Sequence, residues 1–209
     1  MSPILPTTYF GSIFQFALAA QHKAYQVDGF EHFVKQSYRN RCEIYGANGL
    51  LKLIVPLKKW NNHSSSKDIE ISYDENWQNL HWRSIESAYR TSPYFEFYED
   101  DLKPLFFLQE NNLFSYNLQL ENELKELLQI RSSSSISSSY EASEPDWRKI
   151  IHPKNKELVG KKNFPTYIQV FESKHHFLAN LSILDLIFNL GPNSKNYLEN
   201  LSLEAWQKK

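Results

Sequence analysis

The sequence is poor in cysteine and glycine, with one and six of them among 209 residues. A single cysteine excludes an intramolecular disulfide and any metal site built from several thiolates, and it suits a reducing compartment. The glycines form neither a Gly-x-Gly-x-x-Gly pattern nor a Walker loop. The Gly-x-Ser-x-Gly signature of many hydrolases is also missing. No short motif of this kind therefore assigns a reaction to the chain.

The chain also lacks an excess of either charge, since its formal net charge is -1. This balance argues against sequence-independent binding of nucleic acid, so we predict no nucleic-acid partner. No apolar run approaches the roughly 20 residues that a membrane-spanning helix needs. The segment Met1–Ile4 shows no basic and then apolar signal-peptide pattern. A cytoplasmic protein with no membrane span is therefore the simplest expectation.

The seven histidines lack the His-Glu-x-x-His spacing of a zinc site. Glu172, His175 and His176 lie close enough in sequence to contact a metal, but such proximity often arises by chance. We therefore predict no metal and no cofactor.

Aromatic residues are abundant, at 15% of the chain, and they suit both a packed core and the binding of sugar rings or nucleobases. The length fits one sizeable domain. The first elements predicted are a strand over Ile4–Phe10, a helix over Ile13–Gln21 with Ser12 as N-cap, and a strand over Ala24–Val27. This spacing is typical of a β-α-β unit. The loop Thr7–Gly11 would then lie at the carboxyl end of a strand, where sites in α/β sheets concentrate.

Further elements follow from apolar periodicity and from turn residues. A hairpin is predicted over Tyr38–Tyr45 and Leu50–Leu57, strands over Asp68–Tyr73 and Thr166–Phe171, and helices over Asn76–Tyr89, Asp100–Phe107, Asn112–Gln129, Ser182–Leu190 and Asn193–Leu201. Residues 131–165 are serine-rich and polar, which indicates a surface excursion. The predicted fold is a single α/β domain over residues 1–209, with a mixed β-sheet flanked by helices; an α+β arrangement is the alternative.

The polar run Lys35–Cys42 lies between apolar segments and is the first candidate site. On a strand, Arg39 and Arg41 would project to the same side, a geometry suited to gripping a carboxylate or phosphate. The competing interpretation is a solvated strand face on which these arginines pair with Glu43 or with acidic helices. Further donors in the run are Lys35, Gln36 and Asn40.

Cys42 is a candidate nucleophile because positively charged neighbours lower the pKa of a thiol. Strand alternation, however, places it on the face opposite Arg39 and Arg41. We therefore interpret Cys42 as a small buried hydrophobic residue.

Two other side chains have acid–base chemistry. His81 could act as a general base at neutral pH, but it shares a helix face with apolar residues, which favours a buried structural histidine. Ser182 and Asp185 form a Ser-x-x-Asp variant of the capping box. Asn180 and Asn189 have no such role and are the more informative pair.

Four groups of residues follow a known pattern. They are Pro6–Gly11; Tyr38–Ile44 with Val55-Pro56; Trp77, His81 and Trp82 with Ser87–Tyr89 and Ser92–Phe95; and Gln169–Phe171 with Asn180–Pro192. In these positions the chain resembles the WbqC-like family of bacterial proteins, nearly from end to end. Many family members carry Asn-Arg-Asn at Asn40-Arg41-Cys42, which supports Asn40 and Arg41 as site residues and weakens a nucleophilic Cys42.

The resemblance implies a transferase in bacterial surface-polysaccharide (O-antigen) biosynthesis that passes an acyl or aminoacyl (glycyl) group to an amino sugar. The small-molecule substrate would be a nucleotide sugar. In this hypothesis His81 or Asp185 acts as the base, and the substrate-binding residues are Tyr9, Lys35, Gln36, Arg39, Asn40, Arg41, Tyr89, Asn180 and Asn189. The competing hypothesis is a non-catalytic binding or scaffold protein of the sugar-assembly machinery.

Overall fold

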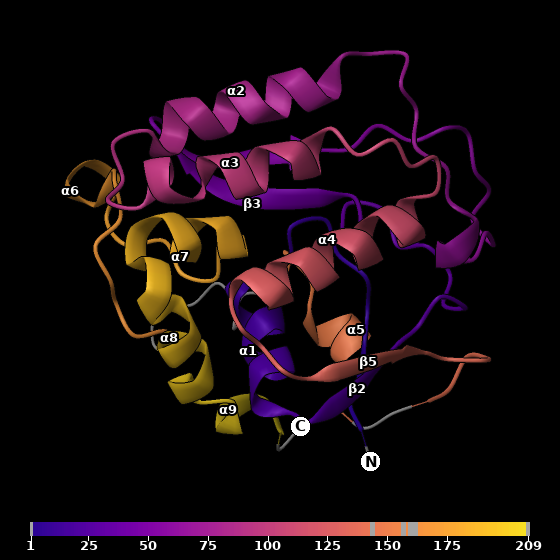
Figure 1. The fold of residues 1–209 in the computed structure, drawn as a ribbon. Helices are drawn as coiled ribbons and strands as arrows, with labels where there is room; N and C mark the ends of the chain where they lie inside the picture. The colour runs from indigo at the N-terminus through magenta and orange to yellow at the C-terminus, as the bar shows by residue number, and fades with distance from the viewer. Residues whose placement is uncertain (1, 143–144, 156–157, 159–162, 208–209) are drawn as a thin grey trace.

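The computed structural model opens with the predicted parallel β-α-β unit (Figure 1). It consists of β1 (Ile4–Leu5), α1 (Ile13–Gln21) and β2 (Ala24–Val27). β1 is shorter than the predicted strand Ile4–Phe10, because Pro6 cannot donate a hydrogen bond to a ladder. The structure describes residues 2–142, 145–155, 158 and 163–207.

The serine-rich stretch contributes a strand that its composition did not indicate. β5 (Ser133–Ile136) runs parallel to β2 and completes a three-stranded sheet in the order β1-β2-β5. The helix α5 (Trp147–Ile150) follows, with Asp146 as its N-cap and Trp147 buried in the core. Residues 131–165 therefore supply both an edge of this sheet and a segment that packs against the core.

The predicted hairpin is present and forms a sheet of its own. β3 (Arg41–Gly46) and β4 (Gly49–Ile54) pair antiparallel, with Gly46 opposite Gly49 across the turn. A parallel sheet, an antiparallel sheet and flanking helices confirm the α/β prediction. The hairpin does not pair with β1, β2 or β5, so the parallel and antiparallel strands belong to two separate sheets.

The remaining helices are α2 (Trp77–Tyr89), α3 (Phe95–Phe106), α4 (Leu113–Leu127), α6 (Glu172–His175), α7 (Ile183–Leu190), α8 (Ser194–Asn200) and α9 (Glu204–Gln207). α3 begins before the predicted Asp100 and holds Pro104 in its last turn, where the missing N–H removes only one helical bond.

Two predicted strands are wrong. Residues 166–171 have no strand and lead into α6, while Asp68–Tyr73 forms only isolated bridges. In the second segment Ile69 and Ile71 are buried. The alternating pattern therefore predicted correctly which side chains are buried, but the segment does not pair with another strand.

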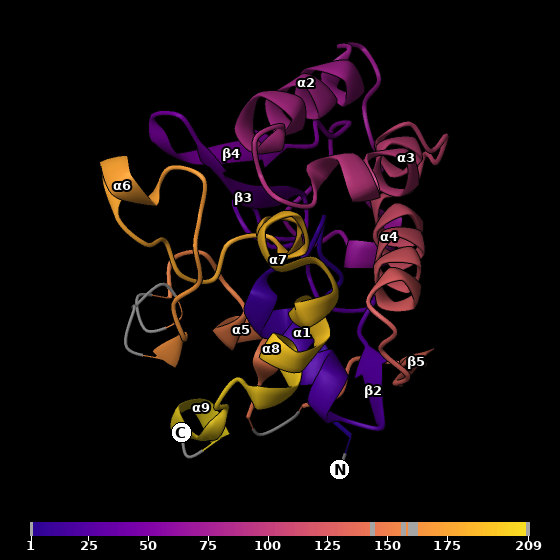
Figure 2. The same ribbon diagram turned by 60° about the vertical axis from the view of Figure 1, so that its left-hand side comes forward.

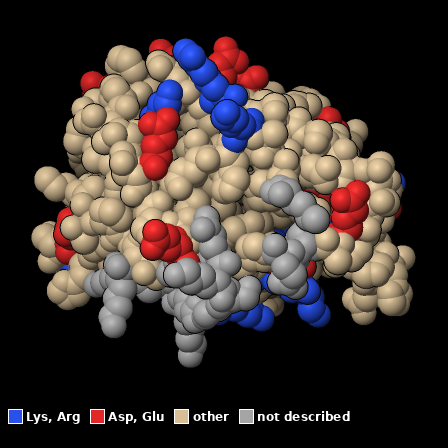
Figure 3. Space-filling model, turned by 90° about the horizontal axis from the view of Figure 1, so that it is seen from below, with Lys and Arg blue, Asp and Glu red and all other residues tan. Residues whose placement is uncertain are grey.

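The helices cover β3 and the start of the chain, whereas β4 is largely exposed. α2 lies across the hairpin, and α7 lies between the hairpin and α1 (Figures 1 and 2). Aromatic rings fill the space between these elements; the rings of Phe10 and Phe106, for example, stack with centroids 4.4 Å apart. On the face seen from below, basic and acidic side chains are interspersed (Figure 3). Among the described residues, no helix is long and apolar enough to cross a membrane.

Gly191 ends α7 in a backbone conformation that only glycine adopts readily, with φ +52° and ψ -124°. A Cβ at this position would lie 2.5 Å from Cδ1 of Tyr94. We expect Gly191→Ala to lower the free energy of unfolding by about 1–3 kcal/mol, as measured by urea denaturation.

The matched control is Gly49→Ala, which has φ +97° but no atom within 4 Å of the added Cβ. This substitution strains the backbone but creates no steric overlap. It should therefore lower the free energy of unfolding less than Gly191→Ala does. An equal or larger cost for Gly49→Ala would contradict a contribution from Tyr94.

Candidate functional site

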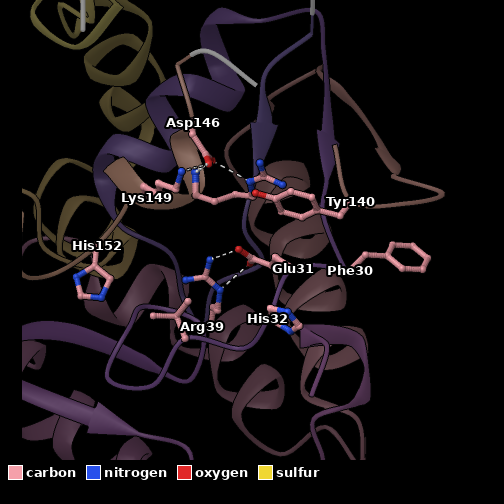
Figure 4. A pocket seen from close by; sticks show the side chains of 10 residues that line it. Phe30, Glu31, His32, Arg39, Tyr140, Asp146, Lys149 and His152 are labelled. Atoms are coloured by element: carbon pink, nitrogen blue, oxygen red, sulfur yellow. Dashed lines mark hydrogen bonds and ion pairs between the residues drawn. The ribbon is translucent and has the colours of Figure 1, made fainter. Parts of the chain in front are cut away.

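A cavity of about 730 Å³ lies between the segment that follows β2 and the segment that carries α5 (Figure 4). Its walls combine apolar, aromatic and charged side chains, namely Phe30, Glu31, His32, Val34, Arg39, Tyr140, Asp146, Arg148, Lys149 and His152. Its volume falls within the range of about 300–1,000 Å³ that is typical of small-molecule sites.

One wall of the cavity is a buried ion pair between Arg39 and Glu31. Nε of Arg39 donates to Oε1 of Glu31 at 2.7 Å, and Nη2 donates to Oε2 at 2.5 Å. Burial raises the pKa of Glu31 above its usual value, and Arg39 offsets only part of this shift. Among the described residues, Nη1 of Arg39 has no hydrogen-bond partner, so it remains as a donor. The guanidinium is therefore rigidly held, with the Arg39 side chain only 2% exposed.

The opposite wall is organised by Arg148, which is buried on α5. Its guanidinium pairs with Asp28, donates from Nε to Asp146 at 2.8 Å, and donates from Nη2 to the carbonyl of Glu141 at 2.8 Å. Burial opposes charge at Asp146, but the bonds from Arg148 and Lys149 outweigh it and lower the pKa of that carboxyl. Both walls are thus cross-linked by arginine–carboxylate contacts, and they preorganise the cavity.

His152 lies at the end of the cavity beside Lys149 and Arg39 (Figure 4). Its Nδ1 accepts the backbone N–H of Lys154 at 3.1 Å, so in the neutral ring Nε2 carries the proton. Burial lowers the pKa of His152, and the positive charges of Arg39, Lys154 and Arg41 lower it further. This end of the cavity therefore combines a neutral imidazole donor with a positive electrostatic environment.

Arg41 adds to that positive environment from the first residue of β3. Its side chain is only 10% exposed, and its ion pair with Glu43 is long, at 3.9 Å. Nε of Arg41 is buried without a hydrogen-bond partner among the described residues. The prediction that Arg39 and Arg41 share one strand is wrong, because β3 begins at Arg41. Both charges nevertheless act on His152.

The predicted acid–base residues lie elsewhere, inside the packed core. Nδ1 of His81 bonds the hydroxyl of Tyr9 at 2.9 Å, and burial lowers the pKa of His81 to about 4. Asp185 accepts the hydroxyls of Tyr89 and Tyr167 at 2.9 and 2.5 Å. These five side chains are buried, and none lines the cavity. They form a hydrogen-bonded interior and not an open site.

The predicted amide side chains bind the protein's own backbone. Oδ1 of Asn180 accepts the N–H of Phe14 in the first turn of α1, a bond that the predicted cap Ser12 does not make. Asn40 donates to the carbonyl of Val55, and Asn189 donates to that of Asp185. Lys35 and Gln36 are exposed and do not line the cavity. Of the predicted site residues, Arg39 alone lines it.

The capping box is only half correct. The hydroxyl of Ser182 caps α7 by accepting the N–H of Leu184, but the carboxylate of Asp185 turns away to tyrosine hydroxyls. The backbone N–H of Ser182 instead donates to the carbonyl of Glu43 at 2.7 Å. This bond ties α7 to the hairpin.

Cys42 is buried, and burial raises the pKa of its thiol above the usual value. This confirms the interpretation as a buried hydrophobic residue. Within the described residues, no group of three or more histidine, cysteine or acidic side chains could hold a metal ion.

Nine of the ten residues that line the cavity were not predicted as site residues; five of them lie in the polar segment that follows β5, and four lie in the segment that follows β2. The available signal was the charged cluster Asp146–Lys149 around the single apolar Trp147, with His152 close behind. An aspartate before a buried aromatic residue is typical of a helix N-cap, and Asp146 has this role here.

Comparison with known proteins gives a family and a distant relative. A family model described as the WbqC-like protein family matches residues 14–157. A Mycobacterium tuberculosis (strain ATCC 25618 / H37Rv) protein named "Uncharacterized protein Rv1507c" is 24% identical over 193 residues, covering 79% of this chain and 83% of that protein. No solved structure matches significantly.

Proposed function

The chain belongs to the WbqC-like protein family, and from this premise we propose that it is a cytoplasmic transferase of bacterial surface-polysaccharide (O-antigen) biosynthesis. Its proposed reaction moves an acyl or aminoacyl (glycyl) group to the amine of a nucleotide-linked amino sugar. The observation that carries the proposal is the preorganised, arginine-lined cavity between Arg39 and Arg148. Such a site suits an anionic small molecule.

The charges of the cavity support an anionic substrate. Arg39, Arg148 and Lys149 each pair with a carboxylate. Lys149 is 80% exposed, however, so its ammonium group can turn from Asp146 to a ligand, and His152 lies in a positive environment. Nη1 of Arg39 and Nε2 of His152 are donors without partners among the described residues. Two fixed donors and a mobile ammonium group can grip phosphate oxygens without the cost of reorganising the site.

The proposed chemistry is amide formation. The amine nitrogen of the sugar attacks the carbonyl carbon of an activated acyl donor, the new C–N bond forms, and the bond from carbon to the leaving group breaks. The proton that the amine loses departs with the leaving group. In this scheme the Nε2–H of His152 donates to the carbonyl oxygen as negative charge develops on it. The base role predicted for His81 or Asp185 has no place in this scheme, because the interior encloses both side chains.

We expect Lys149→Ala and His152→Gln each to lower kcat/KM at least about tenfold, the loss typical of one charged or catalytic contact. The measurement is mass-spectrometric detection of the acylated product from nucleotide-linked amino sugars and acyl or aminoacyl donors. Lys149 is highly exposed, so its replacement should leave the melting temperature nearly unchanged. Lys174→Ala on α6, beside the hairpin turn at Ala47, is the matched control.

Wild-type turnover in the Lys149→Ala, His152→Gln double variant would overturn the placement of the reaction in this cavity. Absence of any product across the panel, with a stable protein partner recovered instead, would favour the scaffold hypothesis. In that case the charged walls of the cavity would contact acidic and basic groups of the partner.

A further inference from the structure

Tyr140 presents an open aromatic face at the end of the cavity opposite His152 (Figure 4). Its side chain is 55% exposed, although the guanidinium carbon of Arg148 lies 4.5 Å from the ring centroid. Because Arg148 is fixed by Asp28, Asp146 and a backbone carbonyl, it backs one face of the ring. No aromatic ring among the described residues stacks on the other face, which is therefore available to a ligand.

The two ends of the cavity differ in chemistry. Phe30 and Tyr140 lie on one side in Figure 4, whereas Lys149 and His152 lie on the other. The first side carries two aromatic rings, with Arg148 over the ring of Tyr140 and Lys67 over that of Phe30. The second side carries the ammonium group of Lys149 and the imidazole of His152, on which the positive charges of Arg39, Lys154 and Arg41 act. A ligand with one planar ring and one anionic group matches this polarity.

We propose that Tyr140 is a stacking platform for the nucleobase of a nucleoside diphosphate whose phosphates bind near Arg39, Lys149 and His152. This inference rests on the proposed function and specifies its substrate. The guanidinium of Arg148 contacts one face of the Tyr140 ring by a cation–π interaction and fixes the orientation of the ring. Every nucleobase has a π-face, so stacking of this kind predicts weak discrimination among bases.

Isothermal titration calorimetry with uridine diphosphate, adenosine diphosphate and inorganic pyrophosphate tests the inference on the full chain. Stacking on one aromatic ring corresponds to a change in Kd of between about fivefold and a hundredfold. We expect Tyr140→Ala to weaken both nucleotides by that factor and to leave pyrophosphate unchanged. Tyr140→Phe keeps the ring and should bind like wild type. Phe97→Ala, at an exposed aromatic residue on α3, is the matched control.

Three outcomes would overturn the inference. They are wild-type nucleotide affinity in Tyr140→Ala, an equal loss of pyrophosphate binding, and Tyr140-dependent binding of the free amino sugar in place of the nucleotides. The proposed function fails separately. If the protein transfers acyl groups but binds nucleotides equally well without the Tyr140 ring, only this inference is wrong. If nucleotide binding depends on Tyr140 but no acyl transfer is detected, only the proposed reaction is wrong.

Discussion

Arg39→Ala is expected to lower the free energy of unfolding by about 3–5 kcal/mol, because it leaves the buried carboxylate of Glu31 without its partner. The pair is bidentate, and both side chains are almost inaccessible to solvent, at 2% and 8%. The carboxylate would then have to lose its charge or draw water into the core. Urea denaturation at neutral pH measures the change directly.

A double variant separates the ion pair from simple packing. Arg39→Leu combined with Glu31→Leu removes both charges, so it should recover most of the stability that Arg39→Ala loses. Arg41→Ala is the comparison at a neighbouring arginine, whose ion pair with Glu43 is 3.9 Å long, and it should lower the free energy of unfolding much less. Similar losses in Arg39→Ala and Arg41→Ala would contradict a special role for the contact with Glu31.

Asp185→Ala is expected to cost about as much, roughly 3–5 kcal/mol, because it removes the shared acceptor of several buried donors. These donors are the hydroxyls of Tyr89 and Tyr167 and Nε2 of Gln169, the last at 2.9 Å. The two hydroxyls would each lose the acceptor of their proton in a buried place, whereas Nε2 of Gln169 would keep the carbonyl of Leu178 as an acceptor. Asp185→Asn keeps the size and one acceptor oxygen, so it should cost less; an equal cost would point to packing alone.

The same residue predicts a pH dependence. Burial raises the pKa of Asp185 in the folded protein, and its hydrogen bonds offset only part of the shift. A raised folded pKa contributes stability below the unfolded value of about 3.9 and loses it as the pH rises through the folded value. We therefore expect the stability of wild type relative to Asp185→Asn to fall as the pH rises from about 4 toward neutrality. A constant difference would contradict the raised pKa.

Much of the fold was predictable where the signal is local. The apolar spacing predicted α1, α2, α4 and α7 to within a few residues, and Asn48-Gly49 marked the hairpin turn. β5 was not predictable, because a serine run shows no alternation and its strand depends on a free edge of β2. The strand propensity of a sequence does not show which neighbouring strand is available for pairing.

The candidate site was less predictable because its contacts are distant in sequence. Arg39 was identified as a site residue, but its partner Glu31 was not. Arg148 and Asp28 are separated by 120 positions, and neither stood out in its local sequence. Asn180 appeared to be free for a ligand, yet it bonds Phe14, 166 positions away. Polar residues thus had recognisable chemistry in the sequence, whereas their partners required the fold.

We propose that the cavity between Arg39 and Arg148 binds an anionic small molecule. The most direct test is a crystal structure of the protein with the nucleotide sugar that most raises its melting temperature, since a ligand that binds the folded state stabilises it. The account predicts electron density for the ligand beside Tyr140, with its phosphates within hydrogen-bonding distance of Lys149 and His152. Density at another surface, such as the hollow lined by Ile168 and His176, with this cavity empty would contradict it.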